Sequence, residues 1–278
     1  MLSPAFNDRV EKKYQLGIDP SGVADLWRDM SAFLRPYGLE AVQKITSVGS
    51  VYFDNKDCDL LRISLLGHLM LFRTRVYEPY GSAPEPIKEY WVEVKTAQGQ
   101  RRRKRRFPLA KSDLLEFLAE TDAPEFLLDP RRQNGGLDVS LDIYRESRET
   151  LLTMGLKPML LVSCKRVAFQ GEVERLSIDW DLRYHHVSMN VYDQNSWKDL
   201  VEPPTGKSDN VILEMKSLQA GVPDWFFELQ RRFPIREREY LKPVEGMGFL
   251  FNGPLQNHKE ANYFRPMISQ YVANSLLG

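Results

Sequence analysis

The chain has 278 residues, of which 42% are hydrophobic and 27% charged, and its 38 basic side chains are balanced by 38 acidic ones. This length can bury one sizeable hydrophobic core or two small ones. A net charge of zero argues against a protein that binds nucleic acid over its whole surface, although it leaves room for a local basic site.

Targeting and redox signals favour a protein of the cytoplasm. The N-terminus from Met1 to Val10 lacks the basic start and apolar run of a signal peptide. The longest apolar stretches, such as Gly155 to Val162, are too short to cross a bilayer. The two cysteines, Cys58 and Cys164, show neither a metal-binding spacing nor a disulfide framework. We therefore expect a cytoplasmic location and no membrane insertion by this chain.

Five segments have the apolar spacing of amphipathic helices. Pro36 and Gly38 end the first of them, and a proline can open the fourth. In chain order the predicted helices are Pro20 to Pro36, a short segment after Ser112, about Leu141 to Met154, a segment from Pro223, and Tyr263 to Leu277.

Between these helices, several segments alternate apolar with charged residues, which is the period of a β-strand. Many strands at short intervals, mixed with separate helices, predict an α+β fold built on an antiparallel sheet. No internal boundary is visible, so residues 1–278 are predicted to form a single domain. The alternating charged faces are Arg9, Glu11 and Lys13; Arg73 and Arg75; Glu93 and Lys95; Arg166; Arg175 and Asp179; and Glu214 and Lys216.

Two interpretations of these charged faces remain open. For any one strand, the simpler interpretation is that the apolar face meets a core and the charged face meets water. Taken together, the faces are rich in cations and carry Leu, Trp, Cys or Ile among the charges, which is typical of partly enclosed positions. Burying so many like charges requires a polyanion or interleaved carboxylates. A tunnel that holds a linear phosphate chain would satisfy this need, since Arg and Lys both bind phosphate oxygens.

The most basic segment is the run from Arg101 to Arg106, which follows a turn signal at Gly99. As the return strand of a hairpin, it would place Arg102, Lys104 and Arg106 on one face and the other three basic residues on the opposite face. One face could line the site while the other is solvated. A solvated turn or a nucleic-acid patch is the alternative.

Common catalytic signatures are missing from the sequence. The four histidines show no metalloprotease pattern, and neither a phosphate-binding P-loop nor a dinucleotide fingerprint is present. Phosphate would therefore be held by side chains and not by a helix N-terminus.

An ordered series of short motifs runs through most of the chain, from about residue 9 to residue 242. They are Arg9-x-Glu11-x-Lys13-Tyr14, Val51-Tyr52-Phe53-Asp54, Leu71-x-Arg73-x-Arg75, Val92-Glu93-Val94-Lys95, Lys104-x-Arg106-Phe107, Arg166-x-Ala168-Phe169, Arg175-x-Ser177-x-Asp179, Ile212-Leu213-Glu214-Met215-Lys216 and Pro223-x-Trp225-Phe226. In this order and spacing the motifs resemble the VTC domain, the polyphosphate polymerase domain of the vacuolar transporter chaperone family, which also occurs in bacterial proteins.

The resemblance implies a fold and a reaction. The family belongs to the triphosphate tunnel metalloenzymes, or CYTH-like superfamily, so we expect an eight-stranded antiparallel β-barrel tunnel flanked by helices that uses Mn or Mg ions. In the polymerase, the γ-phosphoryl group of ATP is transferred to a growing polyphosphate chain. In related members, water attacks a triphosphate instead. The expected partners are ATP, triphosphate or polyphosphate and not nucleic acid, and the oligomeric state stays open.

The resemblance also implies roles for individual residues, with Glu214 as a metal ligand and a set of cations on the phosphates. Among those cations Arg73, Arg75 and Lys95 are the expected catalytic residues. The charged faces add Glu11 as a second metal ligand. The expected substrate-binding residues are Arg9, Lys13, Lys104, Arg106, Arg166, Arg175 and Lys216.

Two positions depart from the family pattern. Cys164 stands where the family has Tyr two residues before the arginine of the Arg-x-Ala-Phe motif. The late Ser-Lys-Tyr motif becomes Arg238-Glu239-Tyr240, so that Glu239 replaces an expected phosphate-binding lysine. Arg236, Arg238 or Lys242 could supply the missing charge. These departures keep two alternatives to a polymerase in view: a triphosphatase of the same fold and a non-catalytic polyphosphate-binding module. The basic run from Arg101 to Arg106 leaves nucleic-acid binding as a third alternative.

Overall fold

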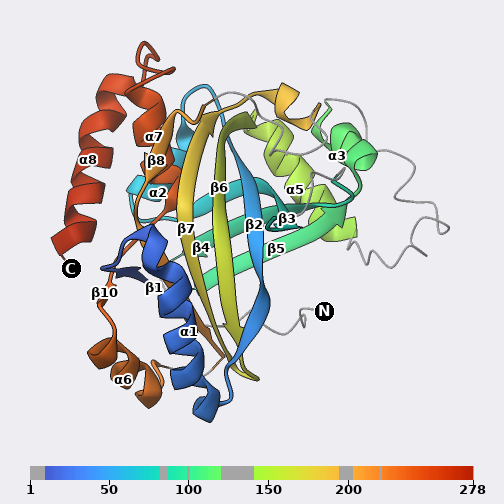
Figure 1. Cartoon of the computed structure of the whole chain (residues 1–278). Helices are drawn as coiled ribbons and strands as arrows, with labels where there is room; N and C mark the ends of the chain where they lie inside the picture. Colours follow the sequence, from blue (N-terminus) through green and yellow to red (C-terminus); the bar gives the residue numbers. More distant parts are fainter. Residues whose placement is uncertain are drawn as a thin grey trace.

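The computed structural model describes residues 10–81, 87–98, 101–119, 141–193, 203–218 and 221–277, and its centre is one large antiparallel sheet (Figure 1). The sheet has ten strands in the order β10-β1-β9-β7-β6-β2-β3-β4-β5, with β8 paired to β7. The strands are β1 (Val10–Leu16), β2 (Glu40–Asp54), β3 (Met70–Pro79), β4 (Tyr90–Gln98), β5 (Arg101–Leu109), β6 (Lys157–Gln170), β7 (Glu174–His186), β8 (Gly206–Ser208), β9 (Val211–Ser217) and β10 (Ile235–Glu237).

The sheet is strongly curled, although its pairing path is open. In Figure 1, β2, β6 and β7 cross the front while β3, β4 and β5 run behind them at a steep angle. Register shifts between Val42 and Thr46 and between Ser163 and Lys165 mark irregularities that bend and twist the long strands. Within the described strands, β5 does not pair with β1 or β10, so the expected closed barrel is a sheet whose ends remain unpaired.

The curl brings β4 and β1, each next to an end strand of the sheet, within reach of each other's side chains. Lys95 Nζ on β4 lies 3.8 Å from Glu11 Oε1 on β1. The eight strands of seven or more residues match the expected number, while β8 and β10 are three-residue additions. The prediction of an antiparallel sheet flanked by helices is therefore confirmed, whereas the described strands do not close into the expected barrel.

The period of the strands separates two faces of the sheet. On β3, Arg73 and Arg75 point to the concave side, whereas Phe72, Thr74 and Val76 point to the convex side. We call the concave side the inner face. It carries Glu11 and Lys13 on β1, Arg73 and Arg75 on β3, Glu93 and Lys95 on β4, Lys104 and Arg106 on β5, Arg166 on β6, Asp179 on β7, and Glu214 and Lys216 on β9.

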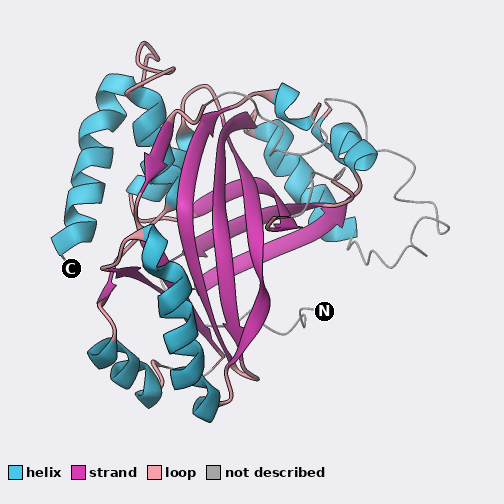
Figure 2. Ribbon diagram, in the orientation of Figure 1, coloured by secondary structure: helices cyan, strands magenta, loops and turns pink. Residues whose placement is uncertain are grey.

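Two pairs of helices cover the convex side (Figure 2). The helices α1 (Val23–Leu34) and α6 (Asp224–Arg232) pack on β1, β9, β7 and β6, with the rings of Tyr14 and Phe226 4.7 Å apart. The helices α3 (Lys111–Leu118) and α5 (Leu141–Thr153) pack on β3, β4 and β5 through Phe107, Phe117 and Tyr144. All four helices were predicted, and α1 is flanked by the 3₁₀ turns η1 (Pro20–Gly22) and η2 (Arg35–Tyr37), with a further 3₁₀ turn, η4, at Met189–Tyr192.

A third group of helices closes one end of the inner face. It consists of α2 (Asp59–Leu65), α7 (Lys242–Phe251) and the predicted C-terminal helix α8 (Ala261–Leu277). Their apolar side chains share one buried cluster with inner-face residues such as Tyr52, Leu71 and Ile212. The inner face is therefore apolar at the end beneath α7 and charged beyond it. The sequence patterns did not predict α2 or α7.

Gly246 allows α7 to approach the sheet closely. A Cβ atom at this position would lie 2.6 Å from Leu160 Cδ2 and 2.7 Å from Tyr184 Cδ1, and both neighbours are fully buried. A separation this short forces the neighbours to move, so glycine is required by packing and not by its dihedral angles.

We therefore expect Gly246→Ala to destabilise the protein. Alanine would favour the helix by up to about 1 kcal/mol, but overpacking a core typically costs about 1–3 kcal/mol. The expected result is a net loss of about 1 kcal/mol in the free energy of unfolding, measured by urea denaturation. Gly22→Ala is the matched control, because no atom lies within 4 Å of its Cβ position. Equal stability of the two variants would contradict the close approach of α7.

Candidate functional site

Glu93 is the central carboxylate of the inner face. Its side chain is 0% exposed and binds two cations from neighbouring strands. Arg73 donates from Nε to Glu93 Oε2 at 2.7 Å and from NH1 to Tyr52 Oη at 2.9 Å. Lys104 Nζ lies 2.5 Å from Glu93 Oε1. Burial alone would raise the pKa of Glu93, but Arg73 and Lys104 hold it well below its ordinary value, so the carboxylate is ionised.

Asp179 plays the same part on the opposite wall. Arg166 donates from Nε and NH2 to its two carboxylate oxygens at 2.5 and 2.6 Å, a bidentate pair. Lys242 Nζ lies 2.5 Å from Asp179 Oδ2 and 3.3 Å from Cys164 Sγ. Burial would lower the pKa of Lys242, but the Asp179 carboxylate raises it, so this lysine stays charged.

A third cluster lies on the paired strands β1 and β9. The register sets Lys13 opposite Glu214 and Glu11 opposite Lys216, so the four side chains share the inner face as diagonal pairs of like charge. Lys13 Nζ donates to the Tyr240 carbonyl at 2.8 Å, and Lys216 pairs with Glu214. Burial would raise the pKa values of Glu11 and Glu214, and the Glu214 carboxylate would further raise that of Glu11, but the surrounding lysines lower both.

The remaining predicted cations extend the inner face at its other end. Arg75, which is buried, donates from Nε to Ser50 Oγ at 2.8 Å. The Arg106 guanidinium lies over the Trp91 ring, with its carbon 4.5 Å from the ring centroid. Arg175 stands opposite Lys216 in the β7–β9 register and so faces the same side. Arg9 lies outside the described residues.

The basic residues that the structure describes in the run from Arg101 to Arg106 lie on two opposite faces of β5, as the hairpin prediction expected. Lys104 and Arg106 point to the inner face, whereas Arg103 is exposed and Arg105 pairs with Glu146 of α5 on the convex side. One face of this strand therefore lines the charged cluster, and the other meets solvent and a helix.

A divalent cation could bind at Glu11 and Glu214. Among the described residues, no group of three or more His, Cys, Asp or Glu side chains is arranged to hold a metal. Two ionised carboxylates on adjacent strands nevertheless suit Mg²⁺, which is commonly bound by one or two carboxylates together with substrate phosphates. The residues present fit a cation shared with a bound phosphate chain.

Lys242 was only one of three cations that the sequence offered in place of the missing motif lysine. Glu239, at the motif position itself, is exposed to solvent, as is Arg236. Arg238 is buried and donates to Gln15 Oε1 at 2.7 Å and Asn210 Oδ1 at 3.2 Å. Lys242 alone of these contacts Asp179. Pro243, next to Lys242, is a signal for the start of a helix in the sequence. The sequence alone could not show that the first residue of α7 lies against Asp179 on the inner face.

The inner face carries many more basic than acidic side chains. The described basic side chains number ten, against four acidic ones (Glu11, Glu93, Asp179 and Glu214), which leaves an excess of six. Burial lowers the pKa of Lys104 to about 7 despite the Glu93 carboxylate, and burial also holds the pKa of Lys95 well below its ordinary value despite Glu11. The basic side chains are Lys13, Arg73, Arg75, Lys95, Lys104, Arg106, Arg166, Arg175, Lys216 and Lys242.

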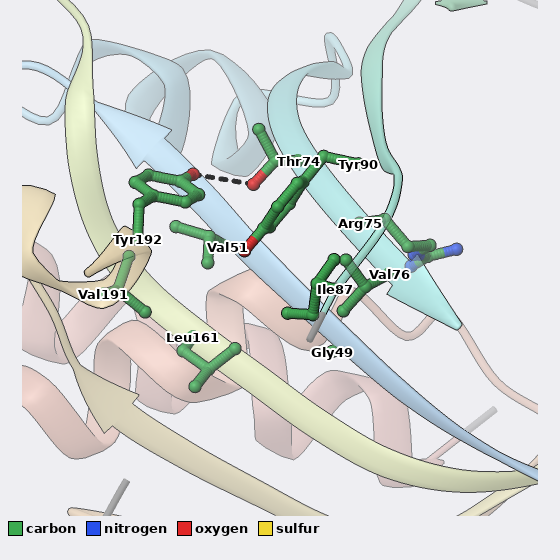
Figure 3. Close-up of a pocket in the computed structure, with 10 residues that line it drawn as sticks. All are labelled: Gly49, Val51, Thr74, Arg75, Val76, Ile87, Tyr90, Leu161, Val191 and Tyr192. Carbon is green, nitrogen blue, oxygen red and sulfur yellow. Dashed lines mark hydrogen bonds between the residues drawn. The ribbon is translucent and has the colours of Figure 1, made fainter. Parts of the chain in front are cut away.

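A separate small pocket lies behind the sheet (Figure 3). Its wall is largely apolar and includes Val51, Val76 and Leu161, and Thr74 Oγ1 lies 2.7 Å from Tyr192 Oη. The Arg75 guanidinium points away from it. With room for about one water molecule, this pocket is a packing defect of the convex core and not part of the charged cluster.

Across the described helices, none combines the length and the apolar content needed to span a membrane.

Comparisons with solved structures show only distant likeness. A proposed adenylate cyclase from Bacillus halodurans is 12% identical over 86% of this chain and 96% of that chain, with a TM-score of 0.45. A proposed adenylyl cyclase from Hippeastrum, described with a dominant triphosphatase activity, is 14% identical over 86% of this chain and 95% of that chain, with a TM-score of 0.42. Mimivirus capping-enzyme triphosphatase is 9% identical over 81% and 86% of the two chains, with a TM-score of 0.33.

Sequence comparison is more decisive. No curated protein sequence matches the chain. A family model described as the VTC domain matches residues 8–248, a span that includes every described strand of the sheet. The charged inner face and this match over most of the chain agree, and the chain belongs to the VTC domain family.

Proposed function

We propose that this chain binds ATP and a polyphosphate chain on its inner face and transfers the γ-phosphoryl group of ATP to that chain with the help of Mn or Mg. The observation that carries the proposal is the excess of six basic over acidic side chains on one enclosed face. Desolvated cations in such number need an anion of comparable charge. A linear triphosphate or polyphosphate has the required charge density and shape.

The anchored guanidinium groups suit this ligand. Arg166 uses two of its five N–H donors on Asp179, and the bidentate bond fixes the direction of the rest. Arg73 is fixed by Glu93 and Tyr52 in the same way. These donors are held in place before the ligand arrives, so no free energy is spent on ordering them during the reaction. Such preorganised positioning is the main requirement for catalysis of phosphoryl transfer.

The proposed reaction places the basic residues around the transferred group. A terminal oxygen of the acceptor chain forms a bond to the γ-phosphorus, the bond from that phosphorus to its bridging oxygen breaks, and ADP leaves. Arg73, Arg75 and Lys95 would stabilise the charge that spreads over the γ-phosphoryl oxygens. The proposed ligands for the remaining phosphates are Arg9, Lys13, Lys104, Arg106, Arg166, Arg175 and Lys216.

Glu11 and Glu214 are the proposed ligands of a divalent cation, which would neutralise part of the phosphate charge. Lys242 joins the proposed phosphate ligands, because its Nζ lies beside Arg166 on their common partner Asp179. A lysine at this position supports an enzyme over a non-catalytic module, because the loss of the motif lysine at Glu239 was the reason for considering that module. Water in place of the acceptor chain would make the same site a triphosphatase.

The proposal predicts turnover of ATP that depends on Glu214. Purified protein incubated with ATP and Mn²⁺ or Mg²⁺ should form polyphosphate and ADP. Gel electrophoresis detects the polyphosphate, and nucleotide chromatography detects the ADP. Glu214→Gln should lower the rate by about 100-fold, because a metal that neutralises transition-state charge contributes several kcal/mol. Glu237→Gln is the control, since this β10 glutamate is 56% exposed. Release of phosphate without polymer would assign the triphosphatase reaction, and no turnover by the wild type would contradict an enzyme.

Lys104 gives the proposal a pH dependence. In the free protein burial lowers its pKa to about 7, so the amine is only partly protonated at pH 7–8. A bound polyanion favours the charged form and raises that pKa, and binding must therefore take up protons in this range. Affinity for tripolyphosphate should fall as the pH rises from 7 to 9.

Calorimetry in two buffers with different ionisation enthalpies measures the protons taken up at pH 7.5. Lys104→Arg should reduce the uptake, because arginine remains charged throughout this range. An uptake that is the same in the wild type and in Lys104→Arg would show that Lys104 does not meet the phosphate chain.

A further inference from the structure

Tyr77 and Trp91 form an aromatic pair at the end of the inner face that lies away from α7. Along β3, the inward residues run from Leu71 in the apolar cluster through Arg73 and Arg75 to Tyr77. The first three are buried, whereas Tyr77 is 40% exposed. Trp91, on the adjacent strand β4, stands opposite Arg75 in the register and is partly exposed. The two rings are therefore diagonal neighbours on one face.

Each ring already lies against an arginine of the charged cluster. The guanidinium carbon of Arg106 is 4.5 Å from the centre of the Trp91 ring, and that of Arg75 is 5.9 Å from the centre of the Tyr77 ring. The aromatic pair is thus continuous with the proposed phosphate ligands and is not an isolated surface patch. An unbranched phosphate chain has no apolar part and would gain little from these rings.

We infer that Tyr77 and Trp91 form a stacking subsite for the base of a nucleoside triphosphate whose phosphates extend toward Arg73. This inference rests on the proposed function and adds to it a binding site for the base of the nucleotide donor. Arg75 and Arg106 serve both parts of the ligand, since each lies between an aromatic ring and the cations deeper on the inner face. The four residue-to-residue steps from Arg73 to Tyr77 span about 13 Å of extended strand, a reach comparable to that of an extended nucleoside triphosphate.

Stacking on an aromatic ring recognises the flat face of a base and not the hydrogen-bonding groups on its edge, so it distinguishes little between one base and another. We therefore expect ATP and GTP to bind alike and purine nucleotides to bind more tightly than tripolyphosphate of equal charge. The quantity that isolates the subsite is the ratio of the two affinities, because any disturbance of Arg106 affects both ligands and cancels in the ratio.

The test measures the dissociation constants of ATP and tripolyphosphate for the full chain by calorimetry. Trp91→Leu should lower the preference for ATP by about 5- to 100-fold, the range of a single base–aromatic stack. Trp91→Phe keeps a ring and should retain most of the preference. In a second measurement, ATP but not tripolyphosphate should quench part of the tryptophan fluorescence, and this part should be missing in Trp91→Phe.

The outcomes separate the subsite from the proposed function. An equal loss of affinity for both ligands in Trp91→Leu, or a wild type that binds tripolyphosphate as tightly as ATP, would overturn the stacking subsite and leave phosphate binding intact. A wild type that binds neither ligand would overturn the proposed function itself, and the subsite with it.

Discussion

The buried carboxylates Glu93 and Asp179 are the constraint on which the inner face depends. Each neutralises two cations from other elements, Glu93 those of Arg73 and Lys104 and Asp179 those of Arg166 and Lys242. Without them these cations would be desolvated and unpaired, at a cost of several kcal/mol per ion. Because the carboxylates also fix the side chains by hydrogen bonds, the same pairs that make the charged face tolerable give it a defined geometry. They offset only part of the charge, and the remaining excess is what a polyanion would meet.

Helix α7 links the apolar end of the inner face to its charged part. Gly246 lets the helix lie directly on Leu160 and Tyr184, and the first residue of the same helix, Lys242, reaches Asp179. A lysine at a helix N-terminus is disfavoured by the helix dipole. The Asp179 carboxylate compensates for this, so the docking of α7 and the charge of the site depend on one contact. The same helix thus covers part of the apolar end of the inner face and adds a lysine to its charged part.

The inner face changes in character along its length. Beneath α7 it is apolar, in the middle it carries the anchored arginines and lysines, and at Tyr77 and Trp91 it is aromatic and more exposed. Such a gradient gives a bound ligand a direction. The proposed transfer would take place deep on the face, near Glu93, while the least charged part of the ligand would lie toward Trp91.

The sequence by itself determined the class of fold, the faces of the strands and the family. Alternation along Leu71 to Val76 and Glu89 to Lys95 places side chains on opposite faces whatever the tertiary structure, because the pleat has a period of two. The ordered motifs identified the family: each motif is short and unspecific by itself, but their order and spacing along the chain are specific. The helices with long apolar stripes, such as α1 and α5, were predictable for the same local reason. Only the tertiary structure decided how the sheet curls, which places Lys95 beside Glu11, 84 positions apart in the chain. It also decided that Glu239 faces solvent while Lys242 enters the site. These outcomes depend on long-range pairing and on the packing of α7, and a local pattern carries no information about either.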